Sequence, residues 1–316
     1  MQPDVSFVIA AHNAEATLGR AIDSALAQQG VTVEVIVVDD CSSDATVGFA
    51  RAYADPRVRV VALENNRGPG GARNAGLDAA RGRWVAVLDS DDAVLPDRLS
   101  AMIGRAEAGS AVMAVDNIVV IHEDGRPQDI MFAEGYLEKL GQLTLADFIG
   151  GNVVFETTFN FGYMKPIFLR EYLEANELRY DENLRIGEDY MLLADALALG
   201  GNCVVEPAVG YAYHVRNGSI SRVLELHHVE AMQRADAAFE ARNRLGGEAK
   251  KAFTRRARSL SQAASFLSLV MHIKQRSPLK AVRTALKDPA AVRHLRMPIE
   301  VRLRRFARQF AYRSGT

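Results

Sequence analysis

Residues 84–92 read WVAVLDSDD, and our prediction of the fold starts from this segment. The apolar run is rich in valine and ends in three acids, which predicts a strand buried on both faces with carboxylates at its carboxyl end. Similar apolar runs stand upstream: VSFVIAA at 5–11, VEVIVVDD at 33–40 and VRVVAL at 58–63. Helical spacing predicts helices between these strands, over residues 15–28, 46–53 and 67–80. This alternation predicts an α/β fold, with a mostly parallel central sheet and helices on both of its faces.

The second half of the chain has a weaker pattern. We expect, in chain order, a helix over 99–109, a strand over 111–122, helices over 167–176 and 190–199, and one strand or a strand pair over 203–215, broken at Pro207. Residues 123–165 are less regular. From about residue 222 onward only helical patterns occur, which predicts a helical extension after the sheet.

Polar residues follow three of the predicted strands: Ala11-His12-Asn13, Asp39-Asp40 and Asp89-Ser90-Asp91-Asp92. A single Asp at a strand end often does no more than cap the next helix. The carboxyl ends of parallel strands, however, meet at one edge of a sheet, where ligands bind. Three clusters at that edge therefore predict a shared crevice for a nucleotide or a metal ion.

The DSD sequence at 89–91 predicts a divalent cation. Two carboxylates one residue apart at the end of a buried strand would repel each other unless a cation neutralised them. Mg²⁺ and Mn²⁺ prefer oxygen ligands and also take the phosphate oxygens of a substrate. Such an ion would stabilise the charge that builds up on a diphosphate leaving group.

Two other protein classes carry similar acids. Haloacid-dehalogenase-type phosphatases place a DxD after an apolar strand, but usually on the first strand of the chain, whereas here three βα units precede it. Response-regulator receivers carry paired acids at a strand end, as at Asp39-Asp40, but their length of about 120 residues would leave the DSD sequence unexplained. Both interpretations are disfavoured.

Glu188-Asp189 is a second candidate site, at the start of the predicted helix YMLLADALAL. The helix dipole alone favours acids at this position, so a capping role is a serious alternative. The preceding loop, DENLRIG, is polar and contains a glycine, as expected for a turn that faces a substrate. Transfer to an alcohol needs a general base, and a carboxylate can accept the proton.

Composition and charge describe the expected surroundings of the protein. Two cysteines favour a reducing compartment, and neither a signal peptide nor an apolar stretch of about 20 residues is visible, so we expect a cytoplasmic protein. Residues 250–316 hold 17 of the 38 Lys and Arg residues beside only Asp288 and Glu300, so the rest of the chain is acidic.

Within this basic region, residues 299–313 place Leu303, Phe306 and Phe310 on one helical side among five arginines. That composition is typical of a helix lying on an anionic membrane surface. The alternative is a basic helix that packs on the acidic body. Nucleic-acid binding is disfavoured, because aromatic residues are sparse in this region and no recognition module is visible.

Five segments, in order, resemble the family-2 inverting glycosyltransferases with the GT-A fold, and bacterial exopolysaccharide enzymes of the succinoglycan type in particular. They are VSFVIAAHNAEATLGRAIDSALAQ, VEVIVVDDCSSDAT, NRGPGGARNAGLDAARGRWVAVLDSDDAVLPDRL, LRYDENLRIGEDYMLLADALALG and AYHVRNGSIS. The resemblance covers about residues 4–222 and keeps order and spacing. It implies a GT-A catalytic domain at 1–222, with a nucleotide-sugar half at about 1–110 and an acceptor half at about 111–222, and a basic helical extension at 223–316.

The resemblance also implies roles for single residues. Ala10, His12 and Glu15 would border the base, Asp40 would read the uracil edge with Asp39 in support, and Arg73 would approach the base or diphosphate. Asp89, with Ser90 beside it, would contact the ribose or metal, and Asp91 would be the main metal ligand. Asp189 would be the catalytic base, and Glu188 would position a sugar. His214 would join the metal site, and with Arg216 it would lie in a loop that closes over the diphosphate. His12 replaces the usual aromatic before the first Asn, so base stacking is less expected here.

The implied reaction is an inverting transfer of a hexose, with UDP-glucose favoured as donor and Mn²⁺ or Mg²⁺ as cofactor. The acceptor would be a polyprenyl-diphosphate-linked saccharide at the inner face of the plasma membrane. An inactive homologue that serves as a scaffold is the alternative, although the presence of both Asp91 and Asp189 argues against it. A nucleotidyltransferase would need a glycine-rich, lysine-containing loop after the first strand, which AAHNAEATLGR lacks.

Overall fold

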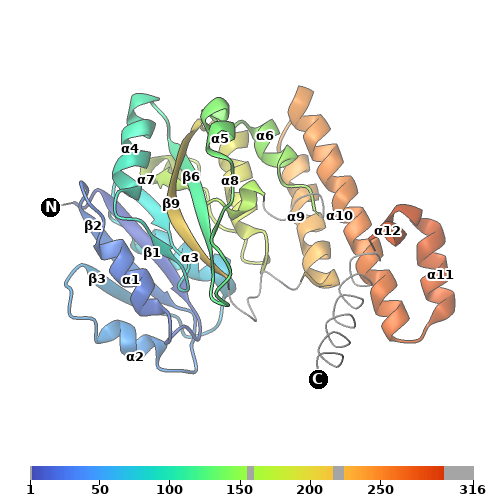
Figure 1. Ribbon diagram of the computed structural model, residues 1–316, viewed down its shortest axis with the longest axis horizontal. Coiled ribbons are helices and arrows are strands. Elements are labelled where there is room, and N and C mark those ends of the chain that lie inside the picture. The colour runs from blue at the N-terminus through green and yellow to red at the C-terminus, as the bar shows by residue number, and fades with distance from the viewer. Residues whose placement is uncertain (1, 155–159, 216–223, 295–316) are drawn as a thin grey trace, which may run out of the picture.

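The computed structural model of the chain describes residues 2–154, 160–215 and 224–294. Its centre is one sheet with the strand order β3-β2-β1-β4-β8-β6-β9-β5, and β7 pairs with β6 off this path. Figure 1 shows helices on both sides of the sheet and the C-terminal helices side by side at one end of the molecule. The α/β fold with a helical C-terminal region confirms the predicted fold class.

The strands are β1 (Val5–Ala11), β2 (Val33–Asp39), β3 (Val58–Ala62), β4 (Trp84–Val87), β5 (Ala93–Val94), β6 (Met113–His122), β7 (Asp129–Ile130), β8 (Ile167–Leu169) and β9 (Cys203–Val215). The helices of the sheet region are α1 (Leu18–Leu26), α2 (Thr46–Arg51), α3 (Gly68–Ala79), α4 (Arg98–Ala108), α5 (Glu134–Leu140), α6 (Leu145–Gly150), a 3₁₀ turn η1 (Phe161–Tyr163), α7 (Arg170–Ala175) and α8 (Glu188–Ala198). The C-terminal helices are α9 (Leu226–Arg242), α10 (Gly247–Lys274), α11 (Pro278–Lys287) and α12 (Pro289–Arg293).

The first four strands form a parallel sheet that is covered on both faces. β2 is buried along its whole length, and alternate residues of a strand point to opposite faces. Ile36 and Val38 pack with Ala72 of α3, whereas Val35 and Val37 belong to the large core that contains Leu18 and Ile22 of α1. Burial on both faces is why these strands read as unbroken apolar runs.

The second half of the sheet is mixed. β8 runs antiparallel to both β4 and β6, while β6 and β9 are parallel to each other. The helix predicted over 167–176 is therefore wrong at its start, because residues 167–169 form β8 and the helix begins at Arg170. Three apolar residues fit a strand or a helix turn equally well, and pairing with β4 decides for the strand. Residues 203–215 form one strand, whose register against β6 shifts near Asp116 and Asn117.

The C-terminal helices α9 and α10 pack against the sheet region. Phe239 of α9 and Phe253 of α10 belong to the same apolar core as the central strands. A buried ion pair joins Arg256 of α10 to Asp236 of α9, and Arg256 also donates to the carbonyl of Asn152. Beyond the end of α10, α11 and α12 extend away from the sheet (Figure 1).

Candidate active site

Two buried cations bind three carboxylates at the carboxyl edge of the sheet. Arg73 contacts Asp89 at 2.8 Å, Glu188 at 2.5 Å and Asp189 at 2.9 Å. Lys165 contacts Asp89 at 2.8 Å and Asp189 at 2.7 Å. The cluster thus joins the end of β4, the helix α3 and the start of α8, which are far apart in the sequence. It holds one more acid than base, so it attracts a further cation.

The ion pairs shift the pKa values of the cluster in opposite directions. Burial by itself would raise the pKa of Asp89, but Lys165 and Arg73 outweigh burial and hold that pKa below its usual range. Burial also disfavours a charged Lys165, yet Asp189 and Asp89 raise its pKa above the usual value. For Glu188 the balance differs, because burial and the neighbouring Asp189 raise its pKa against the influence of Arg73. Lys165 is therefore charged at neutral pH.

Each member of the cluster is placed by its element. Gly187 has a left-handed φ of 92° and is the N-cap of α8, so Glu188 and Asp189 form the first turn of that helix. Arg73 is buried in the middle of α3 and lies over the ring of Tyr180, 5.4 Å from its centroid. Glu188 and Asp189, the predicted catalytic acids, therefore both contact Arg73, which also contacts Asp89.

Lys165 has no role predicted from the sequence. The register of β8 against β4 pairs Ala86 with Ile167, so its continuation places Lys165 beside the residues that follow β4. The carbonyl of Lys165 also accepts a hydrogen bond from the buried Arg98, which pairs with Asp116. A correct strand prediction for 167–169 would have pointed to a lysine next to Asp89, and the predicted helix hid it.

The turn at residues 89–92 is fixed by its last acid. Asp92 is fully buried and accepts hydrogen bonds from the Tyr211 hydroxyl at 2.7 Å and from the His214 backbone N–H at 2.7 Å. Burial, together with Asp89 and Asp91, raises the pKa of Asp92. The hydroxyl of Tyr211 in turn accepts from the Asp89 backbone N–H. This arrangement ties the DSD turn to β9 and separates the roles of its acids: Asp89 pairs with cations and Asp92 holds the turn, while Asp91 and Ser90 are partly exposed.

The predicted base-binding residues lie at the ends of β1 and β2. Asp40 is buried, and its two carboxylate oxygens accept from the backbone N–H groups of Arg67 and Gly68 at 2.6 and 2.8 Å. The carboxylate therefore fixes the loop that leads into α3. The exposed His12 contacts the carbonyl of Asp40 through Nδ1 at 2.9 Å, and Asn66 donates to the same carbonyl. These contacts bring the first, second and third βα loops together.

The remaining predicted residues are placed as follows. Ala10, in β1, is partly buried, and Glu15 is exposed and accepts from the Ala45 backbone N–H. Asp39 is buried, and within the described part of the chain its Oδ1 has no hydrogen-bond partner. His214 lies near the end of β9, and its Nδ1 is 3.1 Å from the Ala212 carbonyl. Arg216 and the tail helix expected at 299–313 lie outside the described residues.

The residues at the DSD turn fit a divalent cation only together with a ligand. Among residues 2–154, 160–215 and 224–294, no group of three or more His, Cys, Asp and Glu side chains has the geometry to hold a metal ion. Asp89 is already paired with Lys165 and Arg73. In neutral His214, donation from Nδ1 to Ala212 leaves the ring lone pair on Nε2, the usual second-sphere arrangement of a ligating histidine. Mg²⁺ commonly takes one or two carboxylates plus substrate phosphates and water, and Asp91 as the protein carboxylate suits that mode.

Two findings concern other surfaces of the molecule. An open hollow of about 400 Å³ is lined by Lys250, Lys251, Thr254, Arg255 and Arg258, all on α10, so it is separate from the carboxylate cluster.

In the described ranges, none of the helices has the length and apolar content that a bilayer-spanning segment needs.

The chain resembles known proteins over nearly its whole length. The sequence model of Glycosyl transferase family 2 matches residues 6–170. The chain is 61% identical over 313 residues to the succinoglycan biosynthesis protein ExoO of Rhizobium meliloti (strain 1021), an alignment that covers 99% of this chain and 90% of that protein. The succinoglycan biosynthesis protein ExoU of the same organism is 34% identical over 92% of this chain and 84% of its own length.

More distant matches are shorter or structural. An Escherichia coli enzyme named UDP-Glc:alpha-D-GlcNAc-diphosphoundecaprenol beta-1,3-glucosyltransferase WfaP is 35% identical over 118 residues, 37% of this chain and 46% of that protein. The crystal structure of S. aureus TarS 1–349 in complex with UDP-GlcNAc superposes with a TM-score of 0.63 over 90% of this chain and 92% of TarS, at 18% identity, which shows a shared fold. The resemblance that the sequence motifs carried is confirmed: this chain belongs to glycosyltransferase family 2 and has the GT-A fold.

Proposed function

We propose that this protein is an inverting, metal-dependent glycosyltransferase that moves a hexose from a UDP-sugar to a saccharide hydroxyl, with UDP-glucose as the favoured donor. The observation that carries the proposal is the junction of Asp89, Glu188 and Asp189 around Arg73 and Lys165. In this cluster Asp189, the carboxylate that we propose for proton transfer, shares both cations with Asp89 of the turn expected to hold the donor.

Asp189 is the proposed general base. Its side chain is 16% exposed, so an acceptor hydroxyl can reach it. Arg73 contacts Oδ1 and Lys165 contacts Oδ2, and each carboxylate oxygen keeps a further lone pair for the incoming hydroxyl. Because both contacts are ionic and buried, they hold the carboxylate in one orientation. Fixed geometry of this kind supplies a large part of the rate in bimolecular transfer.

The donor is proposed to lie along the ends of β1, β2 and β4. Asp39, Asp40, His12 and Ala10 would border the uracil, and Arg73 and Asp89 would face the ribose and diphosphate. Asp91 and Nε2 of His214 would hold Mn²⁺ or Mg²⁺, which when bound would stabilise the charge on the departing diphosphate. Glu188 would position the transferred sugar from the first turn of α8.

The acceptor is proposed to be a polyprenyl-diphosphate-linked oligosaccharide in bacterial exopolysaccharide synthesis. Support comes from the names of the relatives: two act in succinoglycan biosynthesis, and the E. coli enzyme uses UDP-Glc and a diphosphoundecaprenol-linked sugar. A lipid-linked acceptor would place the enzyme peripherally at the inner face of the plasma membrane.

The test is UDP release from a panel of UDP-sugars, measured with Mn²⁺ or with EDTA. One donor should turn over only with metal, and Asp91→Ala and Asp189→Ala should each lower the rate by about 100-fold or more, the usual effect of removing a general base or a Lewis acid. The matched control is Asp78→Ala, because Asp78 is an exposed acid of α3 outside the cluster. If no donor is bound or hydrolysed, the proposal fails, and an inactive scaffold with the family's fold becomes the better account.

A further inference from the structure

The helix α11, residues Pro278–Lys287, shows its large apolar side chains to solvent. Leu279, Val282 and Leu286 are 86%, 57% and 75% exposed. The three residues follow one another at spacings of three and four, so they lie on one helical face. Single exposed apolar residues are ordinary, but a continuous apolar helix face in water marks an interaction surface.

The inner face of α11 consists of small residues. Ala281, Thr284 and Ala285 are half-buried, and α11 packs against α10. A helix that only packed on its own protein would turn its leucines inward. In α11 the order is reversed, because the small face meets α10 and the large apolar face points away. Ile273, near the end of α10, is a further large apolar residue that is 53% exposed.

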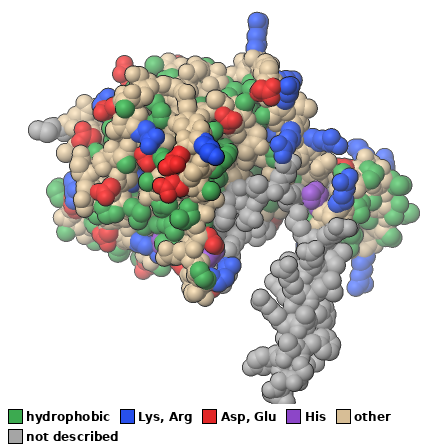
Figure 2. All heavy atoms as spheres, turned by 45° about the horizontal axis from the view of Figure 1, so that its top comes forward, with side chains coloured by type: hydrophobic (Ala, Val, Ile, Leu, Met, Phe, Trp, Pro, Cys, Tyr) green, Lys and Arg blue, Asp and Glu red, His purple; other side chains and the backbone are tan. Residues whose placement is uncertain are grey.

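Basic side chains accompany this apolar face. Lys280, Arg283 and Lys287 lie on α11, each one residue after Leu279, Val282 or Leu286, and all three are exposed. No acidic residue occurs between Glu248 and Asp288. Figure 2 shows green apolar side chains on the surface of the α11–α12 region, with blue Lys and Arg side chains around them.

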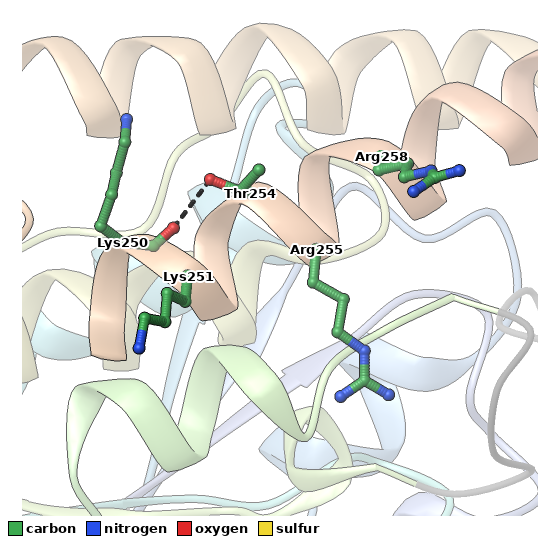
Figure 3. Close-up of a pocket in the computed structure, with 5 residues that line it drawn as sticks. All are labelled: Lys250, Lys251, Thr254, Arg255 and Arg258. Carbon is green, nitrogen blue, oxygen red and sulfur yellow. Dashed lines mark hydrogen bonds between the residues drawn. The ribbon is translucent and has the colours of Figure 1, made fainter. Parts of the chain in front are cut away.

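The basic character continues along α10. Lys250, Lys251, Arg255 and Arg258 line the hollow on that helix, and Figure 3 shows their side chains projecting from it. Lys250 and Lys251 pair with Glu240 and Glu248, but residues 249–287 contain no acid. The charge of α10 and α11 together is therefore complementary to a surface that is negative over a wide area, which a bilayer with anionic headgroups provides.

We propose that α11 binds the surface of an anionic lipid bilayer, with Leu279, Val282 and Leu286 inserted between the lipids. The basic residues beside them reach the headgroups, as Lys and Arg do in helices that lie in the membrane interface. The proposed function supplies the reason for such binding, because a lipid-linked acceptor would lie in the same surface. The surface depends on the exposed face of α11 and on the charge of α10 and α11, and it can fail or hold independently of the chemistry.

The experiment is co-sedimentation of the full chain with vesicles, either of phosphatidylglycerol and phosphatidylcholine in equal amounts or of phosphatidylcholine alone. The wild type should bind the anionic vesicles and lose affinity as salt is added. The triple variant Leu279→Gln, Val282→Gln, Leu286→Gln should bind about 10-fold more weakly or worse, since three apolar side chains no longer enter the lipid. The triple variant Lys280→Gln, Arg283→Gln, Lys287→Gln should lower the affinity for anionic vesicles by at least about 10-fold and weaken its salt dependence.

A matched control replaces Ile130 and Leu199 with Gln, since these apolar residues are 63% and 53% exposed but lie on other elements. That variant should bind like the wild type. Circular dichroism and UDP release from a soluble UDP-sugar should be unchanged in every variant. A variant of α11 that keeps UDP release but loses vesicle binding supports the membrane surface. A wild type that binds vesicles but releases no UDP contradicts only the proposed function.

Three outcomes would overturn the inference. The first is that the wild type fails to bind anionic vesicles. The second is that the apolar variant binds them as well as the wild type does, which would assign binding to another part of the chain. The third is that light scattering shows a wild-type dimer, which the apolar substitutions dissociate, and no vesicle binding. The face would then be an interface between two copies.

Discussion

Lys165 and Arg73 explain how three acids remain together at one buried spot. The Lys165 and Arg73 side chains are 9% and 6% exposed, and the three carboxylates are 9–26% exposed. Carboxylates at this distance from one another would raise each other's pKa values without a cation nearby. Each cation contacts at least two acids, so removing one cation leaves more than one charge uncompensated.

At this scale we predict the effect of Lys165→Met on stability. The substitution keeps most of the length of the side chain but removes the ammonium group that contacts Asp89 and Asp189. The free energy of unfolding at pH 7 should fall by about 3 kcal/mol or more, as when one partner of a buried pair is removed. Urea unfolding measures the loss. Arg83→Met is the control, because Arg83 and its partner Glu107 are 57% and 48% exposed, and it should cost less than about 1 kcal/mol.

The loss should also depend on pH. In the wild type the pKa of Asp89 is lowered, so this group stabilises the fold above the ordinary Asp pKa of about 3.9 and loses that effect as the pH falls. In the variant, loss of Lys165 moves the pKa of Asp89 upward, although Arg73 still contacts this carboxylate. The folded variant therefore takes up a proton at a higher pH than the folded wild type does. The stability difference between the two proteins should therefore narrow from pH 7 towards pH 4. A difference that is constant with pH would contradict this account.

Among the elements, α3 has the closest contact with the sheet. A Cβ added at Gly76 would lie 2.2 Å from Cγ1 of the buried Val8, so only glycine permits this distance between α3 and β1. The approach matters for the site because α3 carries Arg73. Gly76 and Arg73 are three residues apart and lie on the same face of α3, so the close packing at Gly76 helps to set the position of Arg73.

We therefore predict that Gly76→Ala destabilises the fold by about 1–3 kcal/mol through overpacking and lowers UDP release, because α3 and Arg73 must shift. Thermal unfolding and UDP release measure the two effects. Gly48→Ala is the matched control: Gly48 is a glycine of α2 with nothing within 4 Å of its added Cβ. There alanine should leave activity unchanged and stabilise the helix by up to about 1 kcal/mol. Equal behaviour of the two variants would refute the packing argument.

In the whole molecule, the helices α9 and α10 share one core with the sheet region. Arg256 and Asp236 are 6% and 5% exposed, and burial raises the pKa of Asp236 even though Arg256 opposes this. Arg256 also lies over the ring of Tyr190 of α8, 3.6 Å from its centroid. The functional division at residue 222 stays a prediction, but the structural core crosses it.

This predicts that Arg256→Met weakens the whole fold by about 3–5 kcal/mol, because Asp236 would be left buried and unpaired. Trp84, the one tryptophan of the chain, lies in β4 and reports on the central sheet. Its fluorescence and the far-UV circular dichroism should shift to lower urea together. The control is Arg242→Met. Its pair with Asp195 joins α9 to α8, but the arginine is 47% exposed, so the substitution should cost about 1 kcal/mol or less. Loss of helicity before any change at Trp84 would mean that α9 and α10 unfold on their own.

The parallel half of the sheet, the family and the candidate acids can all be predicted from local patterns along the chain. Runs such as residues 33–40 are buried on both faces, and that burial leaves an unbroken apolar signal with its acids at the strand end. Local signals also placed Glu188 and Asp189 at a helix start, where Gly187 takes the left-handed conformation that the turn requires.

Local patterns do not show the place of Lys165, the mixed half of the sheet or the outward apolar face of α11, because all three depend on packing between elements. β8 has three residues, too few for periodicity to tell a strand from a helix, so its pairing with β4 and β6 had to come from contacts distant in the sequence. The direction in which Leu279, Val282 and Leu286 point depends on which side of α11 meets α10. Helical spacing fixes which residues share a face, and packing alone fixes whether that face is covered.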